Sequence, residues 1–407
     1  MSIYKFHLLA KPTGAICNLD CTYCFFLSKE TLYPDSNFRM NDDVHEAYIK
    51  QLLQTHGQGE VTIAWQGGEP TLIGLDFYKR SLEFVAKYKK SGQTVVHSIQ
   101  TNATRISDEW AAFFAENNFL VGVSIDGSKA MHDAYRTYKN GKGSFDRVIH
   151  GYNMLKKYNV DINILCTLHA ENASFPLEIY HFFRDELNAH YMQFIPIVER
   201  NNDIEFPIAK LKKNAVKPLY KQQGSTVTAR SVSASQYGQF LVTIFDEWIK
   251  RDVGTVFVQS FDVALASWLG MHSLCIFSPT CGNALALEHN GDLYACDHYV
   301  EPDYLIGNIM EKNMGELVNS PKQRQFGRNK YDTLPDYCHQ CDVKFACYGG
   351  CPKDRFIQTP TGDDGLNYLC AGYKQFFTHI KQPMNLMAHL LRTGKAPSEI
   401  MNHDNNQ

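Results

Sequence analysis

The sequence predicts an α/β protein in which a partial (β/α)6 barrel is followed by a small cysteine-rich C-terminal domain. From residue 6 to about 198, nearly all-apolar β-rich runs alternate with helical stretches, which is the pattern of a parallel sheet covered by helices. The alternation contains six strands, which favours an open barrel over a closed barrel of eight. Most of the cysteines lie in the last third of the chain, where apolar periodicity is weak.

The strands are expected over residues 6–10, 62–65, 94–99, 119–125, 160–168 and 191–197. Apolar residues recur at three- and four-residue spacing between them, which predicts helices over 41–55, 75–90, 106–117, 145–158 and 173–187. Polar or glycine-rich turns follow the first four strands. Because the chemistry of such barrels lies at the carboxyl ends of the strands, we expect the active site there.

A helix expected over 236–251 leads into the segment ALALEHNGDLYACD. The pair Asn290-Gly291 in this segment predicts a β-hairpin. The expected domains are a barrel over 1–235, a linker helix region over 236–262, the cysteine-rich domain over 263–376, and a C-terminal helix and tail over 377–407.

Composition restricts the partners and the location. The chain has 407 residues, 44% of them hydrophobic, and a net charge of −3, which provides no bulk attraction to nucleic acid or to an anionic membrane. The start, MSIYKFHLLAKPTG, lacks the features of a signal peptide, and no apolar stretch approaches the ~18 residues that span a bilayer. We therefore expect a cytoplasmic protein that binds neither nucleic acid nor membrane.

Three of the twelve cysteines form the pattern Cys17-x3-Cys21-x2-Cys24 directly after the first strand. Disulfides need an even number of cysteines, and a structural zinc site needs four ligands. Three thiolates suit a metal centre that keeps one position open. A partial zinc site or a set of buried thiols is the alternative.

Eight further cysteines lie between residues 275 and 370, enough for two complete four-cysteine sites. They are Cys275, Cys281, Cys296, Cys338, Cys341, Cys347, Cys351 and Cys370. Two zinc ribbons are one interpretation of this count. The remaining cysteine, Cys166, lies in the middle of an expected strand and is predicted to be a buried apolar side chain.

The cysteine triplet, Tyr23 within it, and the turn Gly67-Gly68-Glu69-Pro70 after the second strand carry a family resemblance. Over residues 6 to about 235 the chain resembles the radical S-adenosylmethionine enzymes. The resemblance implies that Cys17, Cys21 and Cys24 hold a [4Fe-4S] cluster. Its fourth iron would bind S-adenosylmethionine, and one electron would then yield methionine and a 5′-deoxyadenosyl radical.

The same resemblance implies further contacts to S-adenosylmethionine. Gly67, Gly68 and Glu69 would bind its methionyl amino group, and glycines there allow close backbone approach. Its carboxylate would contact Ser124 and Arg136, whereas an ordinary turn serine and a solvated arginine are the alternatives. Its adenosine would lie between the Tyr23 backbone and the segment near Val198.

The segment from Cys281 to Cys370 is similar, gap for gap, to the seven-cysteine extension called SPASM. This resemblance implies two auxiliary [4Fe-4S] clusters, making three clusters in all. Cys351 precedes Pro352, as in two-cluster ferredoxins, where such a cysteine serves the other cluster. The implied ligands of cluster I are Cys275, Cys281, Cys296 and Cys351. Those of cluster II are Cys338, Cys341, Cys347 and Cys370. Full protein ligation favours an electron-transfer or structural role for both.

Nearly the whole chain resembles the anaerobic sulfatase-maturating enzymes, on the stretches CNLDCTYCFF, QGGEPTL, SIQTNAT, FLVGVSIDG, NILC, QFI and GDLYACDHY. This family oxidises a cysteine or serine in a Cys/Ser-x-Pro-x-Arg stretch of an unfolded or nascent sulfatase to Cα-formylglycine. The resemblance implies that the radical takes a Cβ hydrogen, that Asp297 takes the thiol or hydroxyl proton, and that an electron leaves through cluster I. It also suggests a flavodoxin or ferredoxin as electron donor.

The proton step sets a condition on Asp297. Transfer of a proton from a thiol with a pKa of ~8.5 to an aspartate with a pKa of ~3.9 is unfavourable by about 6 kcal/mol. Burial must therefore raise the pKa of Asp297, or oxidation of the substrate must acidify the thiol. A turn-capping role is the alternative for Asp297. Gln66 and Gln100, at two strand ends, are expected to orient the peptide backbone, with ordinary loop glutamines as the alternative.

One departure from the family concerns Phe26. Related sequences can carry a tyrosine there, so a role that requires its hydroxyl is in doubt. The rival function within the same architecture is a SPASM-type enzyme that forms a thioether or crosslink on a ribosomal peptide. A zinc-dependent scaffold without catalysis is the rival from another class.

Overall fold

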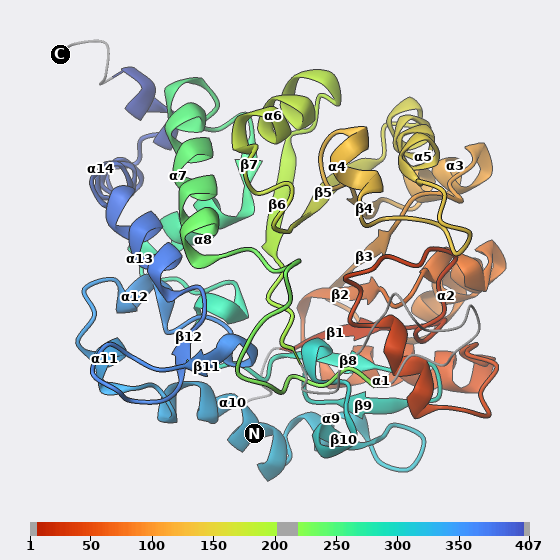
Figure 1. Ribbon diagram of the computed structural model, residues 1–407. Coiled ribbons are helices and arrows are strands. Elements are labelled where there is room, and N and C mark those ends of the chain that lie inside the picture. Colours follow the sequence, from red (N-terminus) through yellow and green to blue (C-terminus); the bar gives the residue numbers. More distant parts are fainter. Residues whose placement is uncertain (1–5, 202–218, 403–407) are drawn as a thin grey trace.

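The computed structural model describes residues 6–201 and 219–402, which form a ten-stranded sheet flanked by helices (Figure 1). The strand order is β10-β9-β8-β1-β2-β3-β4-β5-β6-β7. β1 to β6 are parallel neighbours in chain order, which confirms the predicted α/β fold with a parallel sheet. These strands are β1 His7–Ala10, β2 Gly59–Trp65, β3 Gln93–Thr101, β4 Phe119–Ser124, β5 Asp161–Leu168 and β6 Tyr191–Pro196.

Helices connect the parallel strands and lie along the outside of their arc (Figure 1). They are α1 Asp42–Thr55, α2 Leu75–Tyr88, α3 Asp108–Glu116, α4 Lys129–Asp133, α5 Phe145–Lys157 and α6 Pro176–His181. Side-chain caps define two of the starts, because Asn41 accepts from Val44 N and Ser107 from Trp110 N. The predicted helix over 173–187 is shorter than expected, since α6 continues as a π-helical turn over Phe182–Glu186.

The C-terminal part extends the sheet at both of its edges. β7 Phe257–Val258 joins β6, and β8 Ala284–Leu287 pairs in parallel with β1. β9 Asp292–Tyr294 and β10 Leu305–Asn308 then add antiparallel strands to β8. The predicted hairpin around Asn290-Gly291 is therefore present. Its pairing with the first barrel strand was not predicted, and it carries the cysteine-rich segment to the barrel mouth.

The remaining helices form the C-terminal part of the protein. They are α7 Ala234–Arg251, α8 Gln259–Trp268, α9 Met314–Val318, α10 Pro321–Asp332, α11 Asp336–His339, α12 Lys344–Cys347, α13 Cys370–His379 and α14 Lys381–Arg392. A separate two-stranded sheet consists of β11 Arg355–Ile357 and β12 Leu366–Asn367. No helix within the described ranges combines the length and apolar character that a membrane crossing needs.

Two glycines allow α7 and α13 to pack closely. A Cβ added to Gly372 would lie 2.1 Å from the carbonyl oxygen of Ala234 and 3.0 Å from the nitrogen of Gly238. Only glycine at position 372 permits this approach, which fastens the C-terminal helices to the barrel.

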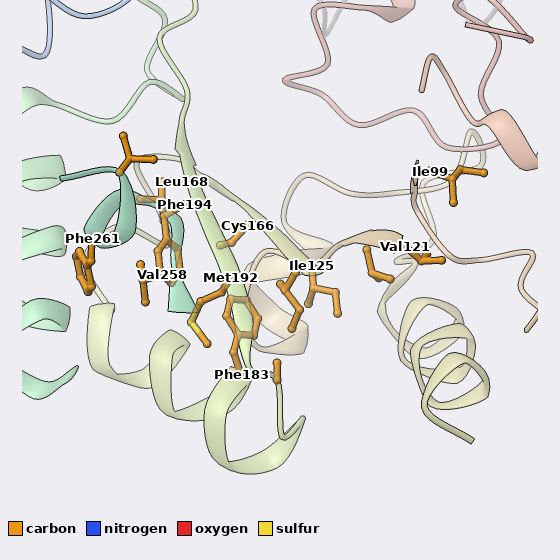
Figure 2. Packing of buried hydrophobic residues seen from close by; sticks show 14 of the residues in the cluster. Ile99, Val121, Ile125, Cys166, Leu168, Phe183, Met192, Phe194, Val258 and Phe261 are labelled. Atoms are coloured by element: carbon orange, nitrogen blue, oxygen red, sulfur yellow. The ribbon is translucent and has the colours of Figure 1, made fainter. Parts of the chain in front are cut away.

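A continuous hydrophobic core lies between the barrel strands and the surrounding helices. Figure 2 shows Cys166 of β5 among apolar side chains such as Leu168, Met192 and Phe194. The Cys166 side chain is fully buried, which confirms its predicted role as a core residue.

Candidate active site

The loop after β1 gathers Cys17, Cys21 and Cys24 at the carboxyl end of the sheet. The nitrogen of Cys24 donates to the carbonyl of Cys21 at 3.0 Å, and the nitrogen of Leu19 points at the sulfur of Cys17 at 3.3 Å. Burial raises the pKa of the Cys21 thiol to about 12 and also raises the pKa of Cys17, and the neighbouring thiols add to both rises. Three crowded thiols of this kind ionise readily only beside a strong positive charge, which bound iron supplies. The donor set therefore fits an iron–sulfur cluster.

The Gly67-Gly68-Glu69-Pro70 turn lies against this loop. The nitrogen of Gly68 donates to the carbonyl of Gly14 and that of Glu69 to the carbonyl of Ile16. A Cβ at Gly68 would lie 2.1 Å from the carbonyl oxygen of Ile16, so glycine is required by the close approach of two backbones. The turn after β2 and the cysteine loop after β1 therefore form one rigid surface.

The Glu69 carboxylate is fully buried and satisfied within the protein. It accepts from the nitrogen and hydroxyl of Thr71, from the hydroxyl of Thr101 and from the nitrogen of Asn102, at 2.6 to 3.0 Å. Three of these bonds reach Oε1 and one reaches Oε2, so Oε2 keeps an acceptor position. Glu69 thus ties the β2 turn to the β3 turn, and its contact with S-adenosylmethionine stays a prediction.

Arg136 is buried and not a solvated arginine, with 7% of its surface exposed. Its Nε donates to Asp126 Oδ2 at 2.8 Å, and the Tyr23 hydroxyl donates to the same oxygen at 2.6 Å. Burial acts to raise the pKa of Asp126, but the positive charge of Arg136 and the hydrogen bonds from Arg136 and Tyr23 outweigh it, and the pKa lies below its usual value. The hydrogen bond of Tyr23 therefore joins the cysteine loop to the turn after β4, where Arg136 and Asp126 form a buried ion pair.

Ser124 and Gln100 lie side by side at the ends of β4 and β3. Gln100 Nε2 donates to Ser124 Oγ at 3.0 Å. Val198 is buried just beyond β6. Among the described residues, the buried side-chain oxygen Oε1 of Gln66 has no hydrogen-bond partner, which leaves an acceptor for a ligand. The structure thus brings the predicted S-adenosylmethionine and peptide residues to one end of the sheet.

Asp297 begins a short 3-10 turn, Asp297–Tyr299, directly after Cys296. Its Oδ1 lies 2.5 Å from the Nζ atom of Lys11, and the Lys11 side chain is 1% exposed. The same ammonium group lies 4.1 Å from the centre of the Phe26 ring. Burial acts to raise the pKa of Asp297, but Lys11, His298 and Lys29 outweigh it, and the pKa lies below its usual value. Of the two routes open to Asp297, a pKa raised by burial is therefore absent, because a buried lysine faces the carboxylate, and acidification of the thiol by oxidation is the route that remains.

The eight C-terminal thiols form two groups in space. In the first group, burial raises the pKa of Cys281, Cys296 and Cys351, and Cys275 contributes to each rise. The second group shares one pocket, whose lining includes the thiols of Cys338, Cys341, Cys347 and Cys370. Burial raises the pKa of Cys347 to about 12 and of Cys370 to about 11, with contributions from Cys338 and Cys341. The groups have the membership predicted for clusters I and II, and ligation itself stays a prediction.

All twelve cysteines lie in the described ranges, and none of them is in a disulfide. Cys275, Cys281 and Cys296 come from the hairpin region, whereas Cys351 comes from the loop after α12. Metal ligation by the first group would therefore link these two segments, which also pack in the same hydrophobic cluster.

Comparison with known proteins decides the family. Residues 12–183 match the radical SAM superfamily, and residues 275–342 match SPASM, an iron–sulfur cluster-binding domain. The chain is 43% identical to a serine-type anaerobic sulfatase-maturating enzyme of Bacteroides thetaiotaomicron, over 97% of this chain and 94% of that relative. The chain belongs to the anaerobic sulfatase-maturating enzymes.

Two further comparisons agree with this family. A cysteine-type anaerobic sulfatase-maturating enzyme of Clostridium novyi is 35% identical, over 91% of this chain and 94% of the relative. A solved structure described as native anSMEcpe with bound AdoMet and Cp18Cys peptide has a TM-score of 0.81 at 31% identity, covering 95% of this chain and 99% of that one.

As an anaerobic sulfatase-maturating enzyme, the chain is a radical SAM oxidoreductase that binds S-adenosylmethionine and iron–sulfur clusters. The family sets aside the zinc interpretations of the cysteines and the rival thioether- or crosslink-forming function. The SPASM match ends at residue 342, so Cys347, Cys351 and Cys370 lie beyond it. Their place beside the matched cysteines comes from the structure.

Sequence reasoning missed two charged residues of this anaerobic sulfatase-maturating enzyme. Lys11 directly follows β1, and Asp126 follows β4 after a single residue. Both lie at carboxyl ends of strands, where functional groups were expected, so their positions carried a usable signal. Asp297, the partner of Lys11, is distant in the chain, and no local pattern predicts either this pair or the pair of Asp126 with Arg136.

Proposed function

We propose that this chain oxidises a serine or cysteine in a Cys/Ser-x-Pro-x-Arg stretch of an unfolded sulfatase to Cα-formylglycine under anaerobic conditions. The observation that carries the proposal is the 43% identity, over 97% of this chain, to an enzyme named for serine-type sulfatase maturation. The fold match to a family member with a bound peptide supports a polypeptide substrate.

We infer that Cys17, Cys21 and Cys24 hold the cluster that works with S-adenosylmethionine, and that the two C-terminal thiol groups hold two auxiliary [4Fe-4S] clusters. When bound, the first cluster and S-adenosylmethionine would supply hydrogen-atom abstraction from the substrate. The auxiliary clusters would accept the electron that the substrate loses. The ring of Tyr23 and the Arg136–Asp126 pair support the cofactor end of the site. The close contact between the cysteine loop and Gly68 supports binding of the methionyl part of S-adenosylmethionine beside the cluster.

Asp297 is the proposed base for the substrate hydroxyl or thiol. An ordinary aspartate and a thiol already differ by about 4.6 pKa units, and Lys11 lowers the pKa of Asp297 further. Asp297 is therefore a weak base toward the resting substrate. It accepts the proton only as the substrate residue loses an electron and becomes more acidic. Lys11 keeps Asp297 ionised. Because it also makes Asp297 a weaker base, the substrate hydroxyl or thiol keeps its proton until the substrate residue loses an electron.

Gln66 and Gln100 are the proposed contacts to the peptide backbone. The unpartnered Oε1 of Gln66 suits a peptide N–H donor. Gln100 is held in place by its bond to Ser124, and a Cβ at Gly122 would lie 2.1 Å from its Oε1. A glutamine fixed in this way positions a backbone without paying further ordering entropy.

The proposed electron donor is a flavodoxin or ferredoxin, and the proposed location is the cytoplasm. Cysteine-bound clusters require thiols that stay reduced, which is the condition of that compartment. The net charge of −3 supports the absence of nucleic acid and membrane partners.

The test is anaerobic incubation of the reconstituted protein with S-adenosylmethionine, a reductant, and matched peptides that contain Ser-, Cys- or Ala-x-Pro-x-Arg. The serine peptide should lose two hydrogen atoms, and the cysteine peptide should also exchange sulfur for oxygen. The alanine peptide should stay unchanged. Formation of 5′-deoxyadenosine with no change in either reactive peptide would refute the proposed substrate.

A further inference from the structure

The fully buried cations of this protein differ in their counter-ions. Lys11, Lys29 and Arg136 each lie within 4 Å of a carboxylate, at 2.5, 3.9 and 2.8 Å respectively. Lys330 on α10 is 0% exposed, yet no carboxylate of the described residues lies within ion-pair distance of it. A buried cation without a partner loses its hydration and gains no attraction from an opposite charge in return. Lys330 therefore needs a negative charge from another source.

The surroundings of Lys330 identify that source. Its Nζ donates to the carbonyl of Cys275 at 2.5 Å and to that of Ile276 at 2.9 Å. Arg355 and the thiols of Cys351, Cys281 and Cys275 lie near its ammonium group, and these thiols would carry negative charge as cluster ligands. These are three of the four cysteines in the first C-terminal thiol group.

Arg355 at the start of β11 is half-buried, and backbone carbonyls also hold its side chain. Its guanidinium donates to the carbonyls of Gly349, Tyr348 and Lys330 at 2.9, 2.7 and 2.6 Å. No carboxylate of the described ranges forms an ion pair with it either. The contact with Lys330 places Arg355 beside α10, in the lower part of the molecule in Figure 1.

Arg355 faces both thiol groups. Four thiols lie near its guanidinium group. Cys338 and Cys347 belong to the second C-terminal group, and Cys351 and Cys281 belong to the first. The Arg355 charge is thus near thiols of both predicted auxiliary clusters, whereas the thiols near Lys330 belong to the first group. Backbone carbonyls hold both side chains in place and neutralise neither charge.

We propose that Lys330 and Arg355 are built-in counter-ions of the auxiliary clusters, Lys330 for cluster I and Arg355 for both, and that they raise the reduction potentials of these clusters. A reduced cluster carries one more negative charge than an oxidised one, so a nearby buried cation favours the reduced state. The inference rests on the proposed cluster ligands and not on the identity of the peptide substrate.

The test is an anaerobic redox titration of the complete, cluster-loaded enzyme, followed by electron paramagnetic resonance. Lys330→Gln and Arg355→Gln remove the charge but keep amide donors for the carbonyls, and Lys330→Arg and Arg355→Lys keep the charge. Lys322→Gln, at an exposed position of the same helix, is the matched control. Addition of S-adenosylmethionine perturbs the N-terminal cluster signal and so identifies it.

At a fixed potential, Lys330→Gln should lower the reduced-to-oxidised ratio of cluster I at least tenfold, a shift of about 59 mV for a one-electron couple. Cluster II should change less. Arg355→Gln should shift both auxiliary clusters, and neither variant should shift the N-terminal cluster. Lys322→Gln and the two charge-keeping variants should stay near the wild-type potentials.

A change below twofold in both glutamine variants, with iron content intact, would overturn the proposal. If the glutamine variants lose auxiliary iron, retention of iron by Lys330→Arg and Arg355→Lys would support the counter-ion role. Equal loss in all four variants would overturn it. Wild-type protein without auxiliary clusters would instead refute the ligand assignment. Unreactive sulfatase peptides alongside shifted potentials would refute only the proposed function.

Discussion

Lys11 Nζ lies 2.5 Å from Asp297 Oδ1, so the first barrel strand and the cysteine-rich hairpin meet at the proposed base. Parallel pairing of β8 with β1 brings the two residues together, because Lys11 follows β1 and the hairpin that begins with β8 ends at Asp297. A lysine buried in this way orients the carboxylate and keeps it charged. The pair is therefore the central element of the proposed proton transfer.

Replacing Asp297 by Asn should lower formylglycine formation by about a hundred- to ten-thousand-fold, the range for loss of a general base. The shape of the side chain is retained, so all clusters should remain. Product is measured by mass spectrometry, 5′-deoxyadenosine by chromatography, and iron by chemical assay. Asp303→Asn, at an exposed position nearby, should behave as wild type. An unchanged rate in Asp297→Asn would reject Asp297 as the base.

Replacing Lys11 by Met should destabilise the protein by about 3–5 kcal/mol, because it leaves Asp297 as an unpaired buried charge. The double variant Lys11→Met/Asp297→Asn should be more stable than Lys11→Met alone, since both charges are gone. Lys11→Arg should restore much of the product formation. Thermal unfolding of the loaded enzymes and product assays measure these effects. If the losses of stability of the two single variants simply add in the double variant, the stabilising interaction between Lys11 and Asp297 is refuted.

Replacing Gly68 by Ala should weaken S-adenosylmethionine binding at least tenfold and reduce retention of the N-terminal cluster. The added Cβ would lie 2.1 Å from the Ile16 carbonyl oxygen, so the cysteine loop must move. Binding is measured by equilibrium dialysis and cluster retention by iron assay. Gly57→Ala is the matched control, because a Cβ at Gly57 meets no atom within 4 Å. Equal binding in both variants would show that the close approach is unimportant.

Acid should destabilise the protein partly through His45. Its ring is fully buried and stacks on Phe77 with ring centres 3.8 Å apart, and burial, with a contribution from Arg80, lowers its pKa to about 3. The unfolded state binds a proton near pH ~6.5, so stability is fully present above that value and falls as pH decreases toward the folded pKa. Well below pH 6.5 the slope approaches about 1.4 kcal/mol per pH unit.

His45→Phe removes this titration and keeps the aromatic packing. Between pH 7.5 and 5.5, its midpoint of thermal unfolding should fall less than that of the wild type. His190→Gln, at an exposed histidine, should retain the wild-type dependence. The same decrease in His45→Phe and wild type would show that His45 does not contribute.

Local patterns were sufficient for the elements of the barrel. The helix expected over 41–55 is α1 Asp42–Thr55, and the strand expected over 160–168 is β5 Asp161–Leu168. The spacing of apolar residues is set within a few turns of chain, so it can be read without the fold. The spacing of the cysteines similarly indicated metal centres, because ligand geometry restricts it.

The charged pairs required the tertiary structure. The sequence left open whether Arg136 contacts S-adenosylmethionine or is a solvated arginine, and only the fold shows that it is buried against Asp126. Lys330 lies in a polar helical stretch, and only the fold shows that its ammonium is buried beside Cys275. Burial decides the energetic weight of a charge, and burial depends on which distant segments pack together.

The sequence by itself therefore determined the parallel barrel, the three sets of cysteines and the family resemblance, since each depends on local spacing or short motifs. The tertiary structure alone decided that β8 pairs with β1, that Lys11 meets Asp297, and that Arg355 lies near thiols of both auxiliary groups. These contacts join segments distant in the chain. Their formation depends on the packing of the whole molecule, which no short stretch of sequence encodes.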